Sequence, residues 1–256
     1  MRTLMAFMKK EWMEQLRSGK FTIISILFIC LGIMNPAVAK LTPWLLETMA
    51  DSLAQSGMTV TAVEVSALDS WMQFFKNAPM ALIAFVLVES GIFTKEYEKG
   101  TLVQPLTKGL ARYKVVVSKT MVLTVLWTLL YWIYFGITYG YNAYFWDNSV
   151  AQNLLFSVMC WWLAGLLTML MLVFFSSFTD TSTVVLGGTA TAWVFFYVAS
   201  LFAKVKKYSP AILMDGTSLI YGEEVREEYL IAIVVTMVLC VLSFASTVRF
   251  FNKRKL

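Results

Sequence analysis

Apolar residues fill six long stretches of this sequence, and polar residues gather in the segments between them. A helix needs about 20 apolar residues to cross the roughly 30 Å hydrocarbon core of a bilayer. The stretches that approach this length are 21–41, 74–93, 115–139, 154–178, 183–203 and 229–248. The pattern predicts an all-α, polytopic membrane protein with six transmembrane helices in one domain, residues 1–256. A five-span alternative, in which the fifth stretch is re-entrant, stays open.

Two amphipathic segments accompany these stretches, and the first precedes them. Leu4, Met8, Trp12 and Leu16 recur every four positions, with charged residues on the rest of the helical wheel. This repeat predicts a helix over residues 1–19 that lies flat at the membrane interface. Packing of the same helix against a partner protein is the alternative.

The second polar segment, residues 94–114, separates the second and third stretches. Gly100 allows the backbone to reverse, and Thr101 is a suitable N-cap, so a short helix is expected to follow. Charged residues would give this segment a directional polar surface, and three apolar residues would form a knob. We therefore expect it to protrude and dock onto a soluble partner through Glu96, Glu98, Lys99, Gly100, Thr101, Leu102, Val103, Leu106 and Arg112. An ordinary hydrated loop is the alternative.

Composition and charge add an orientation. Hydrophobic residues make up 59% of the chain and charged residues 14%, well below the roughly 25% of soluble proteins. The formal charge of +5 does not predict nucleic-acid binding, because the bases cluster beside apolar stretches. Fifteen of the 21 Lys and Arg residues fall on one side of the six-span topology. The positive-inside rule therefore predicts that both termini and residues 94–114 are cytoplasmic.

Specific residues in both polar segments resemble a known family. Glu11-Trp12-Met13 and the run at 17–21 look like the elbow helix of ABC-2 type transporter permeases. Residues 96–102, followed by Pro105-Leu106 and by 110–112, are similar to that family's loop between its second and third spans. The chain departs from the family at one point. The family more often has proline directly before Leu-Ser-Arg, whereas here the proline is Pro105 and the later residues are Leu110-Ala111-Arg112.

The resemblance implies that a separate subunit hydrolyses ATP and that this chain forms the membrane part of the transporter. Residues 94–114 would carry a coupling helix seated in a groove of a separate ABC ATPase subunit. Two such subunits would bind ATP and Mg and would drive two permease chains, favouring a homodimer over a paired, non-identical permease. This chain has no phosphate-binding loop, so it would bind no cofactor itself. The expected location is a bacterial plasma membrane.

The resemblance also suggests the cargo. Compact permeases of this kind resemble Gram-positive peptide exporters, such as those for phenol-soluble modulins. The expected cargo is an amphipathic peptide, such as a toxin or bacteriocin, or a hydrophobic small molecule, such as an antibiotic.

Some residues inside the apolar stretches are candidates for the pathway or a dimer seam. Glu89 is an acid within the second stretch, where charge is costly and often functional; pairing with a nearby base is the alternative. The fifth stretch has a small, slightly polar side at Gly187, Gly188, Thr189 and Thr191.

Catalytic chemistry in this chain is not expected. Histidine is absent, and the three cysteines, Cys30, Cys160 and Cys240, sit far apart in apolar stretches. Neither a general base nor a metal site is therefore indicated. An intramembrane enzyme and a passive channel or scaffold remain the alternative functions.

Overall fold

The computed structural model describes residues 2–48, 64–107, 109–224 and 226–254, and every regular element in these ranges is helical. In chain order they are α1 (Arg2–Arg17), α2 (Lys20–Thr48), α4 (Ala67–Glu89), α5 (Thr94–Glu98), α6 (Val103–Thr107), α7 (Arg112–Phe145), η1 (Asn148–Val150), α8 (Leu154–Ser176), α9 (Ser182–Ser200), α10 (Ala203–Lys206), η2 (Pro210–Met214), α11 (Gly216–Ile220) and α12 (Arg226–Lys253). Among the described residues, six helices are long and apolar enough to cross a membrane: α2, α4, α7, α8, α9 and α12. The predicted all-α, six-span fold is confirmed.

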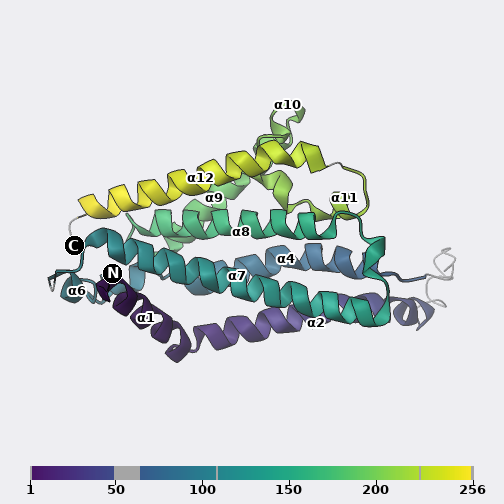
Figure 1. The fold of residues 1–256 in the computed structure, drawn as a ribbon, viewed down its shortest axis with the longest axis horizontal. Coiled ribbons are helices and arrows are strands. Elements are labelled where there is room, and N and C mark those ends of the chain that lie inside the picture. The colour runs from purple at the N-terminus through teal and green to yellow at the C-terminus, as the bar shows by residue number, and fades with distance from the viewer. Residues whose placement is uncertain (1, 49–63, 108, 225, 255–256) are drawn as a thin grey trace.

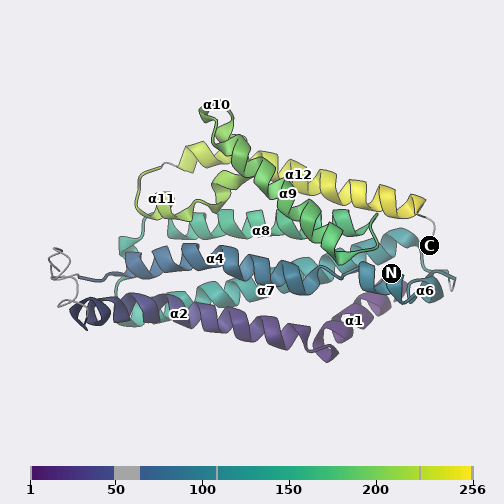
Figure 2. The same cartoon turned by 180° about the vertical axis from the view of Figure 1, so that it is seen from behind.

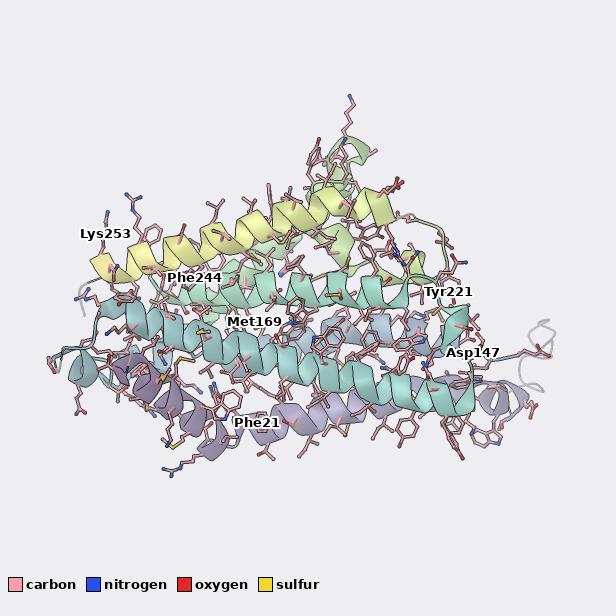
Figure 3. All side chains as sticks on the ribbon, in the orientation of Figure 1. Phe21, Asp147, Met169, Tyr221, Phe244 and Lys253 are labelled. Atoms are coloured by element: carbon pink, nitrogen blue, oxygen red, sulfur yellow. The ribbon has the colours of Figure 1, made fainter. Side chains whose placement is uncertain are left out.

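The long helices lie side by side in a bundle (Figure 1). Both chain ends, α1, α5 and α6 lie at one end, which we call the terminal end; η1 and α11 lie toward the opposite end. α2 packs against α4 and α7, and α8 packs against α7, α9 and α12. Figure 2 shows α9 running obliquely across the back of the bundle toward α10, which projects sideways. Lys253 lies at the terminal end, and Asp147 and Tyr221 lie toward the opposite end (Figure 3).

Several helices differ in their bounds from the apolar stretches that predict them. The sequence predicts a second span over 74–93, but α4 covers Ala67–Glu89. It begins earlier because Ser66 caps it: the Ser66 Oγ accepts from the Leu68 N–H at 3.2 Å, and the Ser66 N–H donates to Asp69 at 2.9 Å. Hydropathy marks the part of a helix that matches hydrocarbon, whereas capping decides where the helix begins.

Aromatic side chains from three helices form the centre of the bundle. The Phe28 ring of α2 lies edge-on to Phe85 of α4 and to Trp127 and Tyr134 of α7, at centroid distances of 6.2–6.4 Å. Phe74 of α4 stacks on Tyr134 at 4.3 Å. Edge-on and stacked pairs are the favoured geometries of aromatic rings, so this core fixes how α2, α4 and α7 face each other.

A buried hydrogen-bond network joins the same three helices. Asn35 is fully buried; its side-chain oxygen accepts from Asn77 at 2.8 Å. Its amide group donates to the Tyr134 hydroxyl at 3.1 Å and to Thr138 at 3.0 Å. Every polar atom of the Asn35 side chain is thus paired, which is required where water is excluded.

The connection from α9 to α12 folds back on itself. Lys206 of α10 donates to Glu224 at 2.6 Å, and Ser209 donates to the Phe196 carbonyl at 2.6 Å. The hydrogen bond to Glu224 raises the pKa of Lys206. Burial alone would raise the pKa of Glu224, but the hydrogen bonds from Lys206 and Tyr229 outweigh it and lower that pKa. The pair is therefore charged at neutral pH and holds the connection closed.

Gly165 of α8 should be sensitive to a single added methyl group. A Cβ there would lie 2.1 Å from the Trp127 ring, so Gly165→Ala must displace a core tryptophan. We expect a loss of about 1–3 kcal/mol in stability, measured as a lower melting temperature of the purified chain in detergent. Gly136→Ala is the control, because a Cβ at Gly136 meets no atom within 4 Å. Equal melting temperatures for the two variants would contradict this packing.

Candidate functional site

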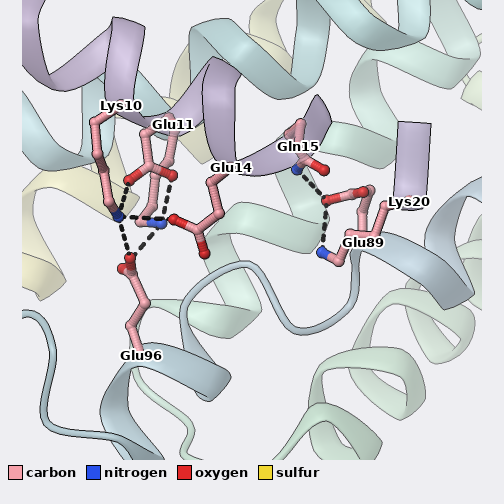
Figure 4. Close-up of polar contacts among 8 residues, drawn as sticks. Lys10, Glu11, Glu14, Gln15, Lys20, Glu89 and Glu96 are labelled. Atoms are coloured by element: carbon pink, nitrogen blue, oxygen red, sulfur yellow. Dashed lines mark hydrogen bonds and ion pairs between the residues drawn. The ribbon is translucent and has the colours of Figure 1, made fainter. Parts of the chain in front are cut away.

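Charged side chains from α1, α5 and α7 meet at the terminal end. Lys119 of α7 contacts Glu11 of α1 at 2.8 Å and Glu96 of α5 at 2.9 Å. Lys10 of α1 lies 2.9 Å from carboxylate oxygens of Glu11, Glu14 and Glu96 (Figure 4). We call these five residues the α1–α5 cluster. It joins segments that are 86 and 108 positions apart in sequence.

The centre of the α1–α5 cluster is buried. The Lys119 side chain is 3% exposed, and those of Glu11 and Glu96 are each 9% exposed. Removing charges from water costs several kcal/mol per ion, which close pairing must offset. Lys119 meets this condition because it has a carboxylate on two sides. A buried cation with two partners in different helices holds those helices in one arrangement.

Lys10 and Glu14 remain charged over a wide pH range. Burial alone would lower the pKa of Lys10, but its contacts with Glu14, Glu11 and Glu96 outweigh this and raise the pKa above 10.5. Burial alone would raise the pKa of Glu14, but the hydrogen bond from Lys10 outweighs it and lowers the pKa below 4.5. The stabilisation from Lys10 is thus lost only as pH rises past its raised pKa, and that from Glu14 only as pH falls through its lowered pKa.

Three carboxylates of the α1–α5 cluster are close enough to suggest a metal site. Oxygen atoms of Glu11, Glu14 and Glu96 lie within 4.8 Å of one another. However, the ammonium groups of Lys10 and Lys119 already contact these oxygens at 2.8–2.9 Å. A cation would have to displace both lysines, so the donor set fits an ion-pair cluster better than a metal centre.

Glu89 forms a second, smaller contact beside the α1–α5 cluster. It is fully buried at the last residue of α4. Its Oε2 accepts from Gln15 of α1 at 2.7 Å and lies 3.4 Å from the Lys20 ammonium (Figure 4). Glu89 lies within the second candidate span, residues 67–98, as expected. Its contact with Lys20 matches the alternative of pairing with a nearby base. Glu89 ties the α1–α2 turn to α4.

The expected docking residues divide between two faces. Glu98, Lys99, Gly100 and Thr101 are exposed, as a docking surface requires, and Leu106 and Arg112 are half-buried. Glu96 and Leu102 are 7% and 2% exposed, so the expectation that they face a partner is wrong. Glu96 turns inward because Lys10 and Lys119 hold its carboxylate, and Leu102 joins the apolar core. The side chain of Val103 lies outside the described residues.

The backbone of residues 94–107 has the predicted reversal at Gly100, but it contains one more helix than predicted. Gly100 has φ +62°, a left-handed conformation that favours glycine, so the predicted reversal is confirmed. The short helix after it, α6, begins at Val103. A further helix, α5, precedes the reversal and was missed, although its sequence Thr-Lys-Glu-Tyr-Glu is compatible with helix.

Sequence reasoning also missed Lys10, Glu14 and Lys119 as site residues, and it noted Glu11 only as part of the elbow-helix motif. The available signal was complementary charge: bases and acids placed on the same membrane face in segments 1–19 and 94–119. This signal predicts that the acids and bases lie on the same side of the membrane, but it does not predict which acid pairs with which base.

The residues expected at a seam on α9 are also divided. Gly187 and Thr191 are exposed, whereas a Cβ on Gly188 would lie 2.6 Å from the Phe175 ring of α8. Gly188 therefore serves packing within the chain. Thr189 is 3% exposed and lines a groove of about 900 Å³ between α4, α8 and α9. Most of the lining is apolar, and Lys206 and Asp215 also border it.

Sequence comparison defines the class of protein to which this bundle belongs. The ABC-2 family transporter proteins match residues 5–206, which include the α1–α5 cluster and five of the six candidate spans. The chain belongs to the ABC-2 transporter family. Together with its six candidate spans, this makes it a multi-pass membrane protein of that family. The family match does not support the intramembrane-enzyme alternative.

One curated relative is similar to part of this chain. The uncharacterized transmembrane protein YxlG of Bacillus subtilis (strain 168) is 22% identical over 152 residues, 58% of this chain. The match covers 57% of YxlG, so the chain spans a little over half the length of that relative.

Lys119 should be the most costly residue of the α1–α5 cluster to remove. Lys119→Met removes the buried counter-charge between Glu11 and Glu96 and leaves only Lys10 to pair with both, so we expect a loss of about 3–5 kcal/mol in the free energy of unfolding. The measurement is the melting temperature of the purified protein in detergent, with exposed Lys99→Met as the control. The double variant Lys119→Met/Glu96→Gln should recover part of the loss. Equal melting of Lys119→Met and Lys99→Met would contradict the pairing.

Proposed function

We propose that this chain is the permease of an ABC exporter, and that a separate ATPase subunit drives it through the exposed face of residues 94–112. One observation carries the proposal. The loop has an outward face with Glu98, Lys99 and Thr101 free to meet a partner, and an inward face bonded to the bundle. ATP and Mg bind to the ATPase subunit, and both termini lie in the cytoplasm of a bacterial plasma membrane.

The inward contacts give the loop a mechanical role. Glu96 joins α5 to α1 and α7 through Lys10 and Lys119. Thr94, at the start of α5, lies with its Oγ1 2.8 Å from the Oγ of Ser182, the first residue of α9. When an ATPase subunit displaces α5 and α6, α1, α7 and α9 therefore move with them. Packed elements of this kind shift as rigid bodies rather than deform.

Two copies of the chain form the complete pathway, each with its own ATPase subunit. In the most apolar stretch of α9, 11% of the residues are buried, the smallest share of the six candidate spans. Its side chains Phe195 and Tyr197 are 69% and 63% exposed. We place α9 at the seam of a homodimer, with the groove beside it as half of the pathway.

The groove favours an apolar or amphipathic cargo. Its volume of about 900 Å³ and its lining by residues such as Leu82, Val86 and Trp193 suit a hydrophobic small molecule or one face of a helical peptide. Lys206 and Asp215 offer one charge of each sign to the polar part of such a cargo. A toxin-like or bacteriocin-like peptide or an antibiotic fits this chemistry.

Charge reversal on the outward face tests the ATPase contact. In membranes of its own host, the permease should co-purify with a subunit that carries a phosphate-binding loop and hydrolyses ATP. The double variant Glu98→Lys/Lys99→Glu should weaken this recovery while the melting temperature stays unchanged, because both side chains are exposed. Glu223→Lys, exposed toward the opposite end, is the control. Full recovery of the subunit with the double variant would refute docking at this face.

A cysteine on α9 tests the homodimer seam. In a chain whose Cys30, Cys160 and Cys240 are replaced by Ser, Gly187→Cys should form a disulfide-linked product of twice the 29.0 kDa chain mass in oxidised membranes. Leu129→Cys is the control, since Leu129 is 39% exposed on α7, on the other side of the bundle from α9 (Figures 1 and 2). Equal cross-linking at both positions would refute a seam at α9.

A further inference from the structure

A second group of charged contacts lies at the terminal end, apart from the α1–α5 cluster. It involves the residue after α12, the hairpin that joins α8 to α9 (residues 177–181), and both sides of the loop between α4 and α7. Each of these segments comes from a different part of the sequence. Their contacts centre on two arginines, Arg254 and Arg112.

Arg254 reaches from the end of α12 to two other segments. It donates to the hairpin carbonyls of Ser177 at 3.0 Å and Thr179 at 3.4 Å, and it pairs with the carboxylate of Asp180. Its guanidinium group also lies 3.8 Å from the centre of the Tyr97 ring of α5. The Arg254 side chain is only 14% exposed, whereas its partner Asp180 is 73% exposed, so the contact with Asp180 alone faces water.

Arg112 closes the arrangement from the other side of the loop. From the first position of α7 it donates to the backbone carbonyl of Asn252 at 3.1 Å and to that of Arg254. The last carbonyls of a helix lack partners within that helix and carry partial negative charge, so a cation there is favourable. Arg112 thereby fixes the end of α12, which in turn aims Arg254 at the hairpin.

Apolar and hydroxyl contacts support the same junction. Phe93, just before α5, packs on Phe251 of α12 at a centroid distance of 5.2 Å, and both rings are fully buried. Thr94 and Ser182 lie hydroxyl to hydroxyl at 2.8 Å beside them. Three kinds of contact therefore join α5, the start of α9 and the end of α12.

We propose that Arg254 is a positioning residue for transport, and this rests on the proposed function. Arg254, Arg112, Asp180 and Tyr97 form a C-terminal clasp that makes α5, the α8–α9 hairpin and the end of α12 move as one unit. The α1–α5 cluster carries the motion of the loop to α1 and α7, and the Thr94–Ser182 contact carries it to the start of α9, the helix beside the groove. The clasp adds the end of α12 and makes the α8–α9 hairpin follow α5.

The chemistry of the clasp requires arginine. One planar guanidinium group serves two carbonyls, a carboxylate and a ring face at once, whereas a lysine ammonium is a single point charge on a flexible stem. Arg254→Lys should therefore fail to replace Arg254 even though it keeps the charge. This distinguishes the clasp from a simple requirement for a base near the membrane.

A disulfide probe measures the clasp without any ATPase. Thr94→Cys and Ser182→Cys, in a chain whose Cys30, Cys160 and Cys240 are replaced by Ser, should be oxidised rapidly by copper phenanthroline in membranes, because the two hydroxyls are in contact. We expect Arg254→Ala and Arg254→Lys to slow this reaction about fivefold. Lys253→Ala, an exposed base one residue away, is the matched control and should leave the rate unchanged.

Transport supplies the functional readout. In the complex with its ATPase subunit, Arg254→Ala should retain ATP hydrolysis but lower the transport of a tested amphipathic peptide per ATP about fivefold. Parent-like cross-linking and parent-like coupling in Arg254→Ala would overturn the clasp. If no ATPase subunit is found, the proposed function fails, and the cross-linking rate still decides whether the clasp exists.

A milder variant covers the case in which Arg254→Ala does not accumulate. Asp180 is 73% exposed, so Asp180→Ala removes one partner of Arg254 with little effect on folding. It should slow the Thr94–Ser182 cross-link about twofold, equivalent to about 0.4 kcal/mol. An unchanged rate in this variant would overturn the clasp.

Discussion

The ammonium group of Lys119 must be paired on two sides, and the terminal end of the bundle is organised around that requirement. A lysine this deeply buried is tolerated only with close counter-charges, because its hydration is lost. One counter-charge comes from α1 and the other from α5, so neither segment can leave α7 without exposing an unpaired charge to a dry site. Lys10 then bridges the same two acids from the solvent side.

This constraint gives the loop between α4 and α7 two faces. Glu96 is buried, whereas Glu98 and Lys99, two and three residues later, are exposed to solvent. Under the proposed function, the exposed groups would meet the ATPase subunit and the buried ones would connect the loop rigidly to the spans. Residues that alternate in direction over one short stretch, α5 and its C-cap Lys99, would supply both. The C-terminal clasp extends the same design, since it ties this helix to α12 and to the α8–α9 hairpin through Arg254.

The two halves of the bundle differ in how firmly they are held. α2, α4 and α7 share an aromatic core and the Asn35 network, which lock their relative orientation. α9 buries little of its surface within the chain, and its connection to α12 is closed by the Lys206–Glu224 pair. Under the proposed function, cargo would pass beside α9, where few contacts within the chain must break.

The sequence by itself determined the all-α class, the six candidate spans, the amphipathic helix before them and the reversal at Gly100. These features depend on hydropathy, helical repeat and the conformational freedom of one glycine, which are local properties. The tertiary structure decided that Glu96 and Leu102 face inward, that Glu89 ends α4 against Lys20, and that Arg254 reaches the hairpin and Tyr97. The Glu89–Lys20 and Arg254–Tyr97 contacts join residues 69 and 157 positions apart, and several bases near the terminal end could have paired with each acid. Which base pairs with which acid depends on how whole helices pack against one another, and no local sequence pattern predicts this packing.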